Sequence, residues 1–234
     1  MKICGFMKTT LLDYPGHVAC TVFTGGCNFR CPYCHNSELL DMDLPSEFTE
    51  EEIFMFLQRR KGVLEGVVIS GGEPTLQPDL PRFIRDIKEQ TGLEIKLDTN
   101  GTAPDMLREL LGEGLLDFVS MDIKSGPGGY TKAAGIRNGG ILRRIEESRD
   151  LLINGDIPYE FRTTVVDGIH TAEDFREIGP FIKGCRSYFL QAYKESSTVL
   201  DLSAGFGTPK KEELLSYAEL VLSYVEKVDI RGVD

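Results

Sequence analysis

Short apolar runs rich in β-branched residues alternate along this chain with longer stretches whose apolar residues recur at helical spacing. The run from His17 to Thr24 is typical of a strand, and Ile53, Phe56 and Leu57 form one face of a helix. Further strands are expected at residues 65–69, 93–97, 116–121, 158–166 and 188–192, with a closing strand near 225–231. Further helices are expected at residues 78–91, 104–111, 140–154, 171–182 and from 208 onward.

Capping signals support several of these helix boundaries. Thr49 is followed three residues later by Glu52, the pattern of a capping box, and Thr171 has Asp174 at the same distance. For the last helix, Thr208 is the expected cap and Pro209 the expected first residue.

This alternation predicts an α/β fold. Strand–helix pairs repeat about six times, which implies parallel strands joined by right-handed crossovers. Six pairs are too few for a complete eight-fold barrel, so a partial (β/α)6 barrel or a curved open sheet is expected. No linker, repeat or low-complexity tract interrupts residues 1–234, which we interpret as a single domain.

The charge and the cysteine usage restrict the class of protein. The formal net charge of −11 argues against a nucleic-acid partner or an anionic membrane partner. No apolar run reaches the 18 or so residues of a membrane span, and the first residues lack the apolar core of a signal peptide. We therefore expect a cytoplasmic protein, in which thiols stay reduced and are available to bind metal.

Three of the six cysteines, Cys27, Cys31 and Cys34, lie within eight residues in the loop 25–36. Three thiolates this close can hold one metal centre, and they leave one position of a four-ligand site open. One reading is a structural zinc site with His35 as the fourth ligand. The spacing favours an iron–sulfur cluster, because His35 directly follows Cys34 and two neighbouring side chains are awkward to aim at one ion.

Polar and glycine-rich motifs follow the next three strands, at the edge where α/β proteins place their active sites. Each motif alone is compatible with a purely structural role, as a tight turn, an Asx turn or a surface ion pair. Together they place carboxylates and a lysine where the two ends of a zwitterion, or a cation, would bind. The residues concerned are Gly71, Gly72 and Glu73, then Asp98 and Thr99, then Met121, Asp122 and Lys124.

The C-x3-C-x2-C motif, with Tyr33 before its third cysteine and GGEP at 71–74, resembles the radical S-adenosylmethionine (SAM) superfamily. The segments DYPG, CPYCHN, DTNG and MDIK more narrowly resemble the activating enzymes of glycyl radical enzymes. The resemblance is to the activase group of anaerobic ribonucleotide reductase first, and to pyruvate formate-lyase activase next. It implies a radical SAM core with a partial TIM-type barrel.

The resemblance also implies a mechanism. Cys27, Cys31 and Cys34 would hold a [4Fe–4S] cluster whose fourth iron binds SAM, and reductive cleavage would give a 5′-deoxyadenosyl radical that takes a hydrogen atom from a partner's glycine. A glycyl radical enzyme would be the protein substrate, and a flavodoxin or ferredoxin would donate the electron. The implied SAM-binding residues are Tyr33, His35, Gly71, Gly72, Glu73, Asp98, Thr99, Asp122 and Lys124. The implied ligands of a monovalent cation, Na+ or K+, are Asp98, Thr99, Met121 and Asp122.

The chain departs from the activase pattern in two places. Some activases have a histidine after the sixth strand that reaches the ribose of SAM, whereas this chain has the run from Gln191 to Lys194. Gln191 and Lys194 are therefore the candidates for the ribose contact. Residues 35–70 contain no cysteine, so the ferredoxin-like insert of some activases is not expected.

Two other functions remain open from the sequence. One is a radical SAM enzyme that acts on a small molecule, such as a 7-deazapurine precursor. The other is a non-catalytic protein, either an iron–sulfur electron carrier or a zinc-binding interaction module. Outside the motifs, Cys4, Cys20 and Cys185 are expected to be structural, His17 and His170 to lie at the surface or in turns, and Arg162 to serve either a pocket or a salt bridge.

Overall fold

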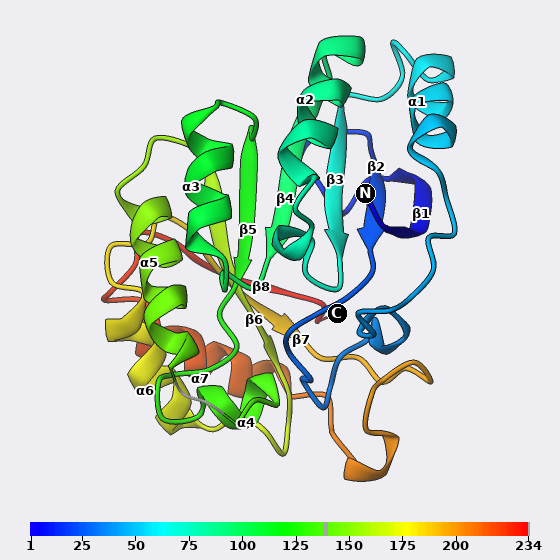
Figure 1. The fold of residues 1–234 in the computed structure, drawn as a ribbon. Helices are drawn as coiled ribbons and strands as arrows, with labels where there is room; N and C mark the ends of the chain where they lie inside the picture. Colours follow the sequence, from blue (N-terminus) through cyan, green and yellow to red (C-terminus); the bar gives the residue numbers. More distant parts are fainter. Residues whose placement is uncertain (138–139, 234) are drawn as a thin grey trace. The chain divides into compact units, whose positions relative to one another are not determined.

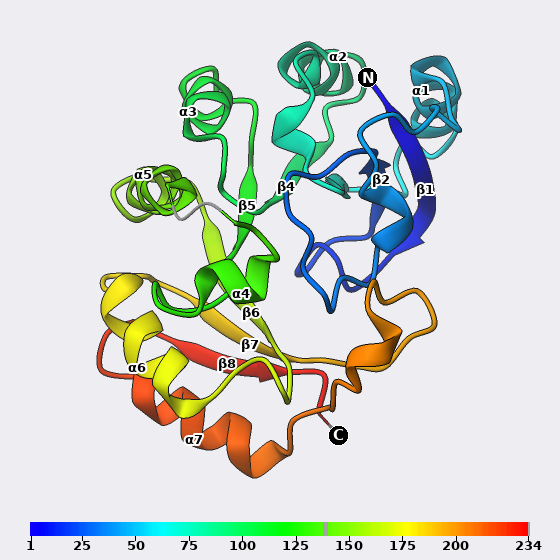
Figure 2. The same ribbon diagram turned by 60° about the horizontal axis from the view of Figure 1, so that its bottom comes forward.

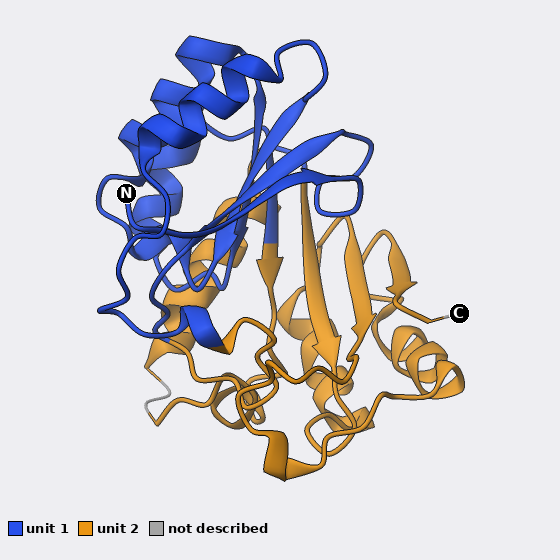
Figure 3. Cartoon of the chain, turned by 90° about the vertical axis from the view of Figure 1, so that its right-hand side faces the viewer, with its two compact units in different colours: residues 1–28, 38–120, 156–158 blue, residues 29–37, 121–155, 159–234 orange. Residues whose placement is uncertain are grey.

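A computed structural model describes residues 1–137 and 140–233 of the chain. The chain divides into two compact units, shown in different colours in Figure 3. Unit 1 comprises residues 1–28, 38–120 and 156–158, and unit 2 comprises residues 29–37, 121–155 and 159–234. We describe each unit by itself, and the expectation of a single domain stays a prediction.

Unit 1 holds the first strands and helices of the chain (Figure 1). The capping box at Thr49 and Glu52 is present at the start of the first helix. The elements are β1 (Ile3–Thr10), β2 (Ala19–Thr24), α1 (Glu50–Arg59), β3 (Gly66–Gly71), the 3-10 helix η2 (Pro74–Leu76), α2 (Leu80–Thr91), β4 (Glu94–Thr99) and α3 (Pro104–Gly112).

In unit 1, β2, β3 and β4 are paired in parallel, and β1 runs antiparallel to β2. Val22, Ile69 and Leu97 are in register and fully buried. The opposite face of the same strands carries Thr21, Val68 and Lys96, also in register. Because side chains alternate along a strand, this second face becomes polar toward the C-terminal ends of β3 and β4.

Unit 2 contains the remaining elements, and β5 (Phe118–Asp122) passes into it from unit 1. The 3-10 helix η1 (Ser37–Leu39) spans another of the points at which the chain passes between the units. The elements that follow β5 are α4 (Tyr130–Ala134), α5 (Ile141–Ile153), β6 (Tyr159–Val165), α6 (Ala172–Phe181), β7 (Tyr188–Ala192), the 3-10 helix η3 (Leu202–Ala204), α7 (Lys211–Val221) and β8 (Val228–Arg231).

In unit 2, β6, β7 and β8 are paired in parallel, and α6 and α7 pack together beside β7 and β8 (Figure 2). Tyr188 and Leu190 are fully buried, whereas Gln191 between Leu190 and Ala192 is exposed. Gln191 therefore lies on the other face of β7 from the buried residues, in register with Arg231 of β8.

The predicted α/β class with parallel strands is confirmed; one helix was missed, and several boundaries differ by one to three residues from the prediction. Helix α4 was not predicted, because its five residues directly follow the run of glycines at 126–129; Gly135, with φ of +63°, ends it. Helix α7 begins two residues later than predicted, because the backbone N–H of Lys210 donates to the Glu213 carboxylate at 2.9 Å and completes the cap there. In the part of the chain that the structure describes, no helix has the length and apolar character needed to cross a membrane.

Candidate functional site

The predicted site residues fall into two groups, one in each unit. Cys27, the 71–73 turn and the Asp98–Thr99 strand end belong to unit 1, whereas the other two cysteines, Asp122, Lys124 and Gln191 belong to unit 2. No group of three or more metal-ligating side chains placed to hold an ion is found among the residues that the structure describes. The three-cysteine site therefore stays a prediction of the spacing, and each group is described in its own unit.

In unit 1, the turn after β3 packs directly on the backbone that leads to Cys27. The N–H of Gly72 donates to Thr24 O at 2.9 Å, and the N–H of Glu73 donates to Gly26 O at 2.8 Å. A Cβ atom on Gly72 would lie 2.2 Å from Gly26 O, so only glycine fits there. Gly71 has φ of +125°, a conformation that L side chains rarely adopt. The two glycines thus let β3 end against the cysteine loop.

Glu73 ties this turn to the end of β4. Its buried carboxylate accepts hydrogen bonds from the Thr75 N–H at 3.1 Å, the Thr75 hydroxyl, the Thr99 hydroxyl at 2.7 Å and the Asn100 N–H at 2.6 Å. Burial raises the pKa of Glu73, and these four donors act in the opposite direction. The carboxylate therefore fixes two strand ends in position.

Asn100 extends this network to the cysteine loop. Its Nδ2 donates to Asn28 Oδ1 at 2.9 Å and lies 3.9 Å from Cys27 Sγ, within range of a weak N–H···S contact. Asn28 in turn donates to the Thr102 hydroxyl at 2.8 Å. Sequence reasoning singled out neither Asn28 nor Thr102; Asn100 stood in the DTNG motif, which was the available signal.

Asp98 has a cationic partner from its own strand. The fully buried Lys96 forms an ion pair with its Oδ1, and the Ser70 hydroxyl donates to its Oδ2 at 3.2 Å. Both Lys96 and Asp98 lie on the polar face of β4, since residues two apart in a strand point the same way. The role of Asp98 at SAM or at a monovalent cation stays a prediction, and Lys96 is a partner that the sequence did not indicate.

In unit 2, the cysteine loop turns tightly, with the N–H of Cys34 donating to Cys31 O at 3.0 Å. Cys31 is buried and Cys34 is half-buried, and burial raises the pKa of Cys31 to about 11. Helix α4 packs on the start of this loop: the Arg30 N–H donates to Ala134 O at 3.0 Å. All six cysteines are thiols rather than disulfide-bonded.

A second segment, residues 194–201, runs along the cysteine loop; we call it the strap. The N–H groups of Leu200 and Asp201 donate to the carbonyls of Cys34 at 3.2 Å and Pro32 at 2.9 Å. His35 Nε2 contacts Lys194 O at 2.6 Å, and Ser37 donates to Thr198 O at 2.5 Å. The predicted candidate Lys194 therefore meets the loop through its carbonyl. Gln191 lies exposed on β7, and its ribose contact stays a prediction.

Asp122 lies between two cations in unit 2. Its carboxylate pairs with Lys124 Nζ at 2.8 Å and Arg162 Nε at 2.5 Å. Burial opposes its ionisation, but Arg162 and Lys124 outweigh burial and hold the pKa of Asp122 well below its usual range. Lys124 stays charged, because Asp122 raises its pKa against the effect of burial. Met121 is buried just before this cluster, and the cation site remains a prediction.

The Tyr33 ring fills the space beside this cluster. It is 4% exposed, and its hydroxyl has no hydrogen-bond partner among the residues that the structure describes. Burial, with the nearby Cys31, raises the pKa of Tyr33, so the hydroxyl is protonated and able to donate. The Tyr33 ring also packs edge-on against the His170 ring, with 5.9 Å between the ring centroids. A buried donor without an acceptor is the feature expected where a bound group supplies the acceptor.

These observations fit a thiolate-held cofactor. The donor set of the loop is three soft sulfur ligands without a fourth protein ligand, which suits an iron–sulfur cluster with one open iron. His35 contacts the strap with its Nε2 atom, so this atom is engaged and a zinc site closed by it is disfavoured.

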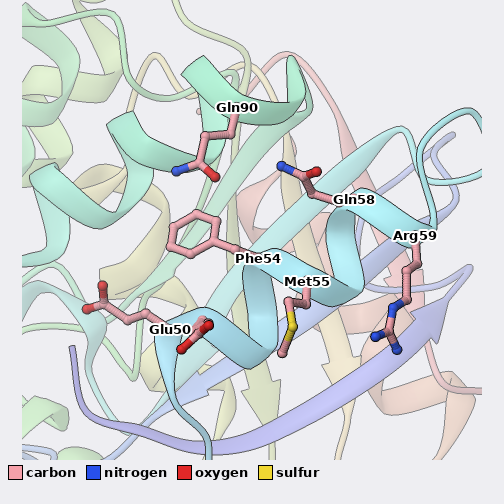
Figure 4. Close-up of a pocket in the computed structure, with 7 residues that line it drawn as sticks. Glu50, Phe54, Met55, Gln58, Arg59 and Gln90 are labelled. Carbon is pink, nitrogen blue, oxygen red and sulfur yellow. The ribbon is translucent and has the colours of Figure 1, made fainter.

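One hollow of about 590 Å³ lies elsewhere, on unit 1 (Figure 4). It is open, and none of the predicted site residues contributes to it. Glu50, one of its two carboxylates, is paired with Arg82 at 2.7 Å. The residues that line it are Glu50, Glu51, Phe54, Met55, Gln58, Arg59 and Gln90.

The other expectations for single residues have mixed outcomes. Cys20 and Cys185 are fully buried, as expected for structural residues. His170 was expected at the surface or in a turn. It closes the turn after β6, where its N–H donates to Val166 O at 3.0 Å, but it is only 5% exposed. Its Nδ1 accepts the Val166 N–H at 3.0 Å, and its Nε2 contacts Lys124 O at 2.8 Å. Arg162 binds Asp122 and so belongs to the charged cluster.

Comparison with known proteins adds the family. The family model described as the Radical SAM superfamily matches residues 21–179. A protein of Methanocaldococcus jannaschii, whose name assigns it to the glycyl-radical enzyme activating enzymes, is 31% identical over 99% of this chain and 96% of its own length. The pyruvate formate-lyase-activating enzyme of Clostridium pasteurianum is 28% identical over 94% of this chain and 83% of its own length.

The fold is shared with solved structures. The structure of Streptococcus suis SuiB bound to S-adenosylmethionine superposes with a TM-score of 0.63 at 16% identity. The match covers 88% of this chain and 48% of that protein. At this identity the likeness concerns the fold alone.

Proposed function

This chain belongs to the radical SAM superfamily, and from this premise we propose that it activates a glycyl radical enzyme. The observation that carries the proposal is the similarity to a named activating enzyme over nearly the whole of both chains. The family implies a [4Fe–4S] cluster and SAM as cofactors. When bound, they supply the reductive cleavage of a sulfonium C–S bond, which makes hydrogen-atom abstraction possible.

In this proposal the three cysteines of the loop hold the cluster, and the other site residues bind and orient SAM. Lys124 meets the SAM carboxylate with its ammonium group, and the pairing of Asp122 with Arg162 and Lys124 keeps that ammonium charged and in place. The backbone around Gly71 and Gly72 meets the SAM amino group. The Glu73 carboxylate holds this turn against the end of β4, and the Glu73 N–H donates to Gly26 O in the cysteine loop.

Residues of the cysteine loop bind the adenosine part in the proposal. The backbone around Tyr33 and His35 faces the adenine, and Gln191 is the candidate for the ribose. Asp98, Thr99, Met121 and Asp122 are the proposed ligands of a monovalent cation. Since Asp98 and Asp122 already have lysine or arginine partners, the cation would have to share these carboxylates.

As the partner we propose anaerobic ribonucleotide reductase, because the DYPG, CPYCHN, DTNG and MDIK segments resemble those of its activating enzymes. Pyruvate formate-lyase is the second candidate, favoured by the similarity to the activating enzyme of Clostridium pasteurianum. We further propose that the protein acts in the cytoplasm, where its thiols stay reduced.

The test is electron paramagnetic resonance of the reduced, cluster-loaded protein incubated with SAM and each candidate partner. A doublet from a glycyl radical on one partner is expected, and it should vanish when Cys27, Cys31 or Cys34 is replaced by Ala. The Cys185→Ala variant is the matched control and should keep its iron, because Cys185 is a buried core residue. SAM cleavage without a radical on any glycyl radical enzyme would instead indicate a small-molecule substrate.

A further inference from the structure

Two tyrosine hydroxyls buried in unit 2 have no hydrogen-bond acceptor. Tyr33 lies in the cysteine loop and is 4% exposed, and Tyr130, the first residue of helix α4, is fully buried. Neither hydroxyl has a hydrogen-bond partner of normal geometry within residues 1–137 and 140–233. Because buried polar groups in folded proteins are nearly always paired, these two hydroxyls need an explanation.

Backbone contacts, and not the Tyr130 hydroxyl, fix helix α4 against the cysteine loop. The Arg30 N–H donates to Ala134 O at 3.0 Å, and a Cβ atom on Gly135 would lie only 1.9 Å from Arg30 O. The Tyr130 ring packs edge-on against the Phe29 ring, with 6.4 Å between the ring centroids. The fold therefore holds Tyr130 beside the loop while its hydroxyl contributes no bond of its own.

The same charged groups act on both hydroxyls. Burial raises the pKa of Tyr33 and of Tyr130. Cys31 and Asp122 raise both values further, and the Lys124 ammonium lowers both. Tyr130 also raises the pKa of Tyr33, as expected for two neighbouring hydroxyls. The Lys124 backbone N–H lowers the pKa of Tyr130 as well, but an N–H is a donor and cannot take the hydroxyl proton.

Among these charged groups, Cys31 is the one whose character changes when a metal cofactor binds. The Lys124 ammonium only donates, and the Asp122 carboxylate already accepts from Lys124 and Arg162. A thiol is a weak acceptor, whereas metal is bound by the thiolate. Assembly of an iron–sulfur cluster at Cys31 would therefore bring anionic sulfur atoms to a place where two phenol protons have no acceptor.

We propose that the hydroxyls of Tyr33 and Tyr130 donate hydrogen bonds to sulfur atoms of the [4Fe–4S] cluster held at Cys31, and that these bonds raise its reduction potential. This inference rests on the proposed function, which supplies the cluster. It gives Tyr130, which no sequence motif indicated, a role at the cofactor. Forming these hydrogen bonds transfers no electron and breaks no covalent bond.

The direction of the effect follows from the charge of the acceptor. Reduction by one electron makes the cluster more negative, and hydrogen bonds to an ionised acceptor are stronger than those to a neutral one. Hydrogen bonds to the sulfur atoms are among the factors that set the potential of such clusters. Loss of one phenol donor should therefore make the cluster harder to reduce.

The experiment compares Tyr130→Phe, Tyr33→Phe and the double variant with Tyr188→Phe as the matched control. Tyr188 is also fully buried in unit 2, but its hydroxyl donates to the Thr163 hydroxyl at 2.7 Å. Each cluster-loaded chain is titrated anaerobically with dithionite and redox mediators in the absence of SAM. Electron paramagnetic resonance quantifies the reduced cluster at each potential. The iron-free form of each chain is unfolded in urea.

We expect the equilibrium constant for reduction to fall about tenfold in Tyr130→Phe and in Tyr33→Phe, which is a potential about 59 mV lower for one electron. The double variant should have a lower potential than either single variant, and Tyr188→Phe should keep the parent value.

In the iron-free chains the expected pattern is reversed. Tyr188→Phe should lower the urea midpoint, because it removes a hydrogen bond inside the chain. Tyr130→Phe and Tyr33→Phe should leave the midpoint unchanged or raise it, since their hydroxyls have no partner to lose.

An unchanged potential in Tyr130→Phe and Tyr33→Phe would overturn the inference, and weaker SAM binding in these variants would then assign the hydroxyls to SAM. A urea midpoint of iron-free Tyr130→Phe as low as that of Tyr188→Phe would also overturn it, because the hydroxyl would then have a partner within the chain. A parent chain that binds no iron would contradict the proposed function together with this inference, so the two failures are distinguishable.

Discussion

At the scale of single residues, Glu73 does more than its sequence motif indicates. Its carboxylate accepts four hydrogen bonds that join the turn after β3 to the end of β4. The motif GGEP suggests a ligand contact, but the four donors come from the chain itself. The carboxylate of Glu73 therefore organises the turn after β3, whose Glu73 N–H donates to Gly26 O next to Cys27.

Replacing Glu73 by Gln should therefore destabilise the protein itself. The amide oxygen can accept only part of the four hydrogen bonds, and its NH2 group would face the Asn100 N–H or the Thr99 hydroxyl. We expect the free energy of unfolding in urea to fall by about 1–3 kcal/mol. Glu109→Gln, an exposed change on α3, is the control and should leave the urea midpoint unchanged. Equal urea midpoints for both variants would show that the hydrogen bonds of Glu73 contribute nothing to stability.

Because the His170 ring is buried, we expect the stability of the protein to depend on pH. Burial lowers its pKa, so the folded protein binds a proton on this ring less readily than the unfolded chain, whose histidine titrates near about 6.5. The unfolded state then holds more protons below that pH, and the free energy of unfolding must fall as the pH drops through and below about 6.5.

Urea unfolding at pH 7.5, 6.5 and 5.5 checks this. The decrease in stability between pH 7.5 and 5.5 should be smaller in His170→Gln than in the parent chain, while carboxylate effects cancel in the comparison. Parallel decreases in the two proteins would contradict the assignment of this loss to His170.

At the scale of elements, the strap shows how a loop distant in sequence fixes the cysteine loop. Its N–H groups bind the carbonyls of Pro32 and Cys34, and the side chains of His35 and Ser37 return two further contacts. The strand–helix pattern placed β7 correctly but said nothing about the segment after it, since loop conformations have no periodicity. The role of the strap follows from the fold of unit 2.

Leu200→Pro tests the strap, because proline lacks the N–H that Leu200 donates to Cys34 O. We expect alkylation of Cys34 in the cluster-free protein to become several-fold faster, with a loss of about 1 kcal/mol in stability. Mass spectrometry of the alkylated peptides gives the rate at Cys34 and, as an internal reference, at the buried Cys185. Leu202→Pro is the matched control, since Leu202 opens η3 and proline is tolerated at a helix start. Unchanged alkylation in Leu200→Pro would show that the strap does not restrain the loop.

At the scale of the whole molecule, cofactor binding should be visible as stability. A ligand that binds only the folded state raises the free energy of unfolding by about 2.7 kcal/mol when its concentration is 100 times its Kd. For a chain of 234 residues, SAM at that level should raise the Tm of the cluster-loaded protein by roughly 5–10 °C. Anaerobic calorimetry measures the shift. Cys31→Ala, which lacks a cluster ligand, should show none; an equal shift in that variant would mean that SAM does not bind through the iron.

The sequence by itself determined the fold class, the helix caps at Thr49 and Thr171 and the family, because periodicity, capping and ligand spacing are local properties of the chain. It also supplied the three cysteines as a candidate site. Only the tertiary structure decided what holds those residues: Glu73 between two strand ends, Lys96 beside Asp98, and the strap on the cysteine loop. These contacts join residues far apart in sequence, where no local pattern specifies the partner.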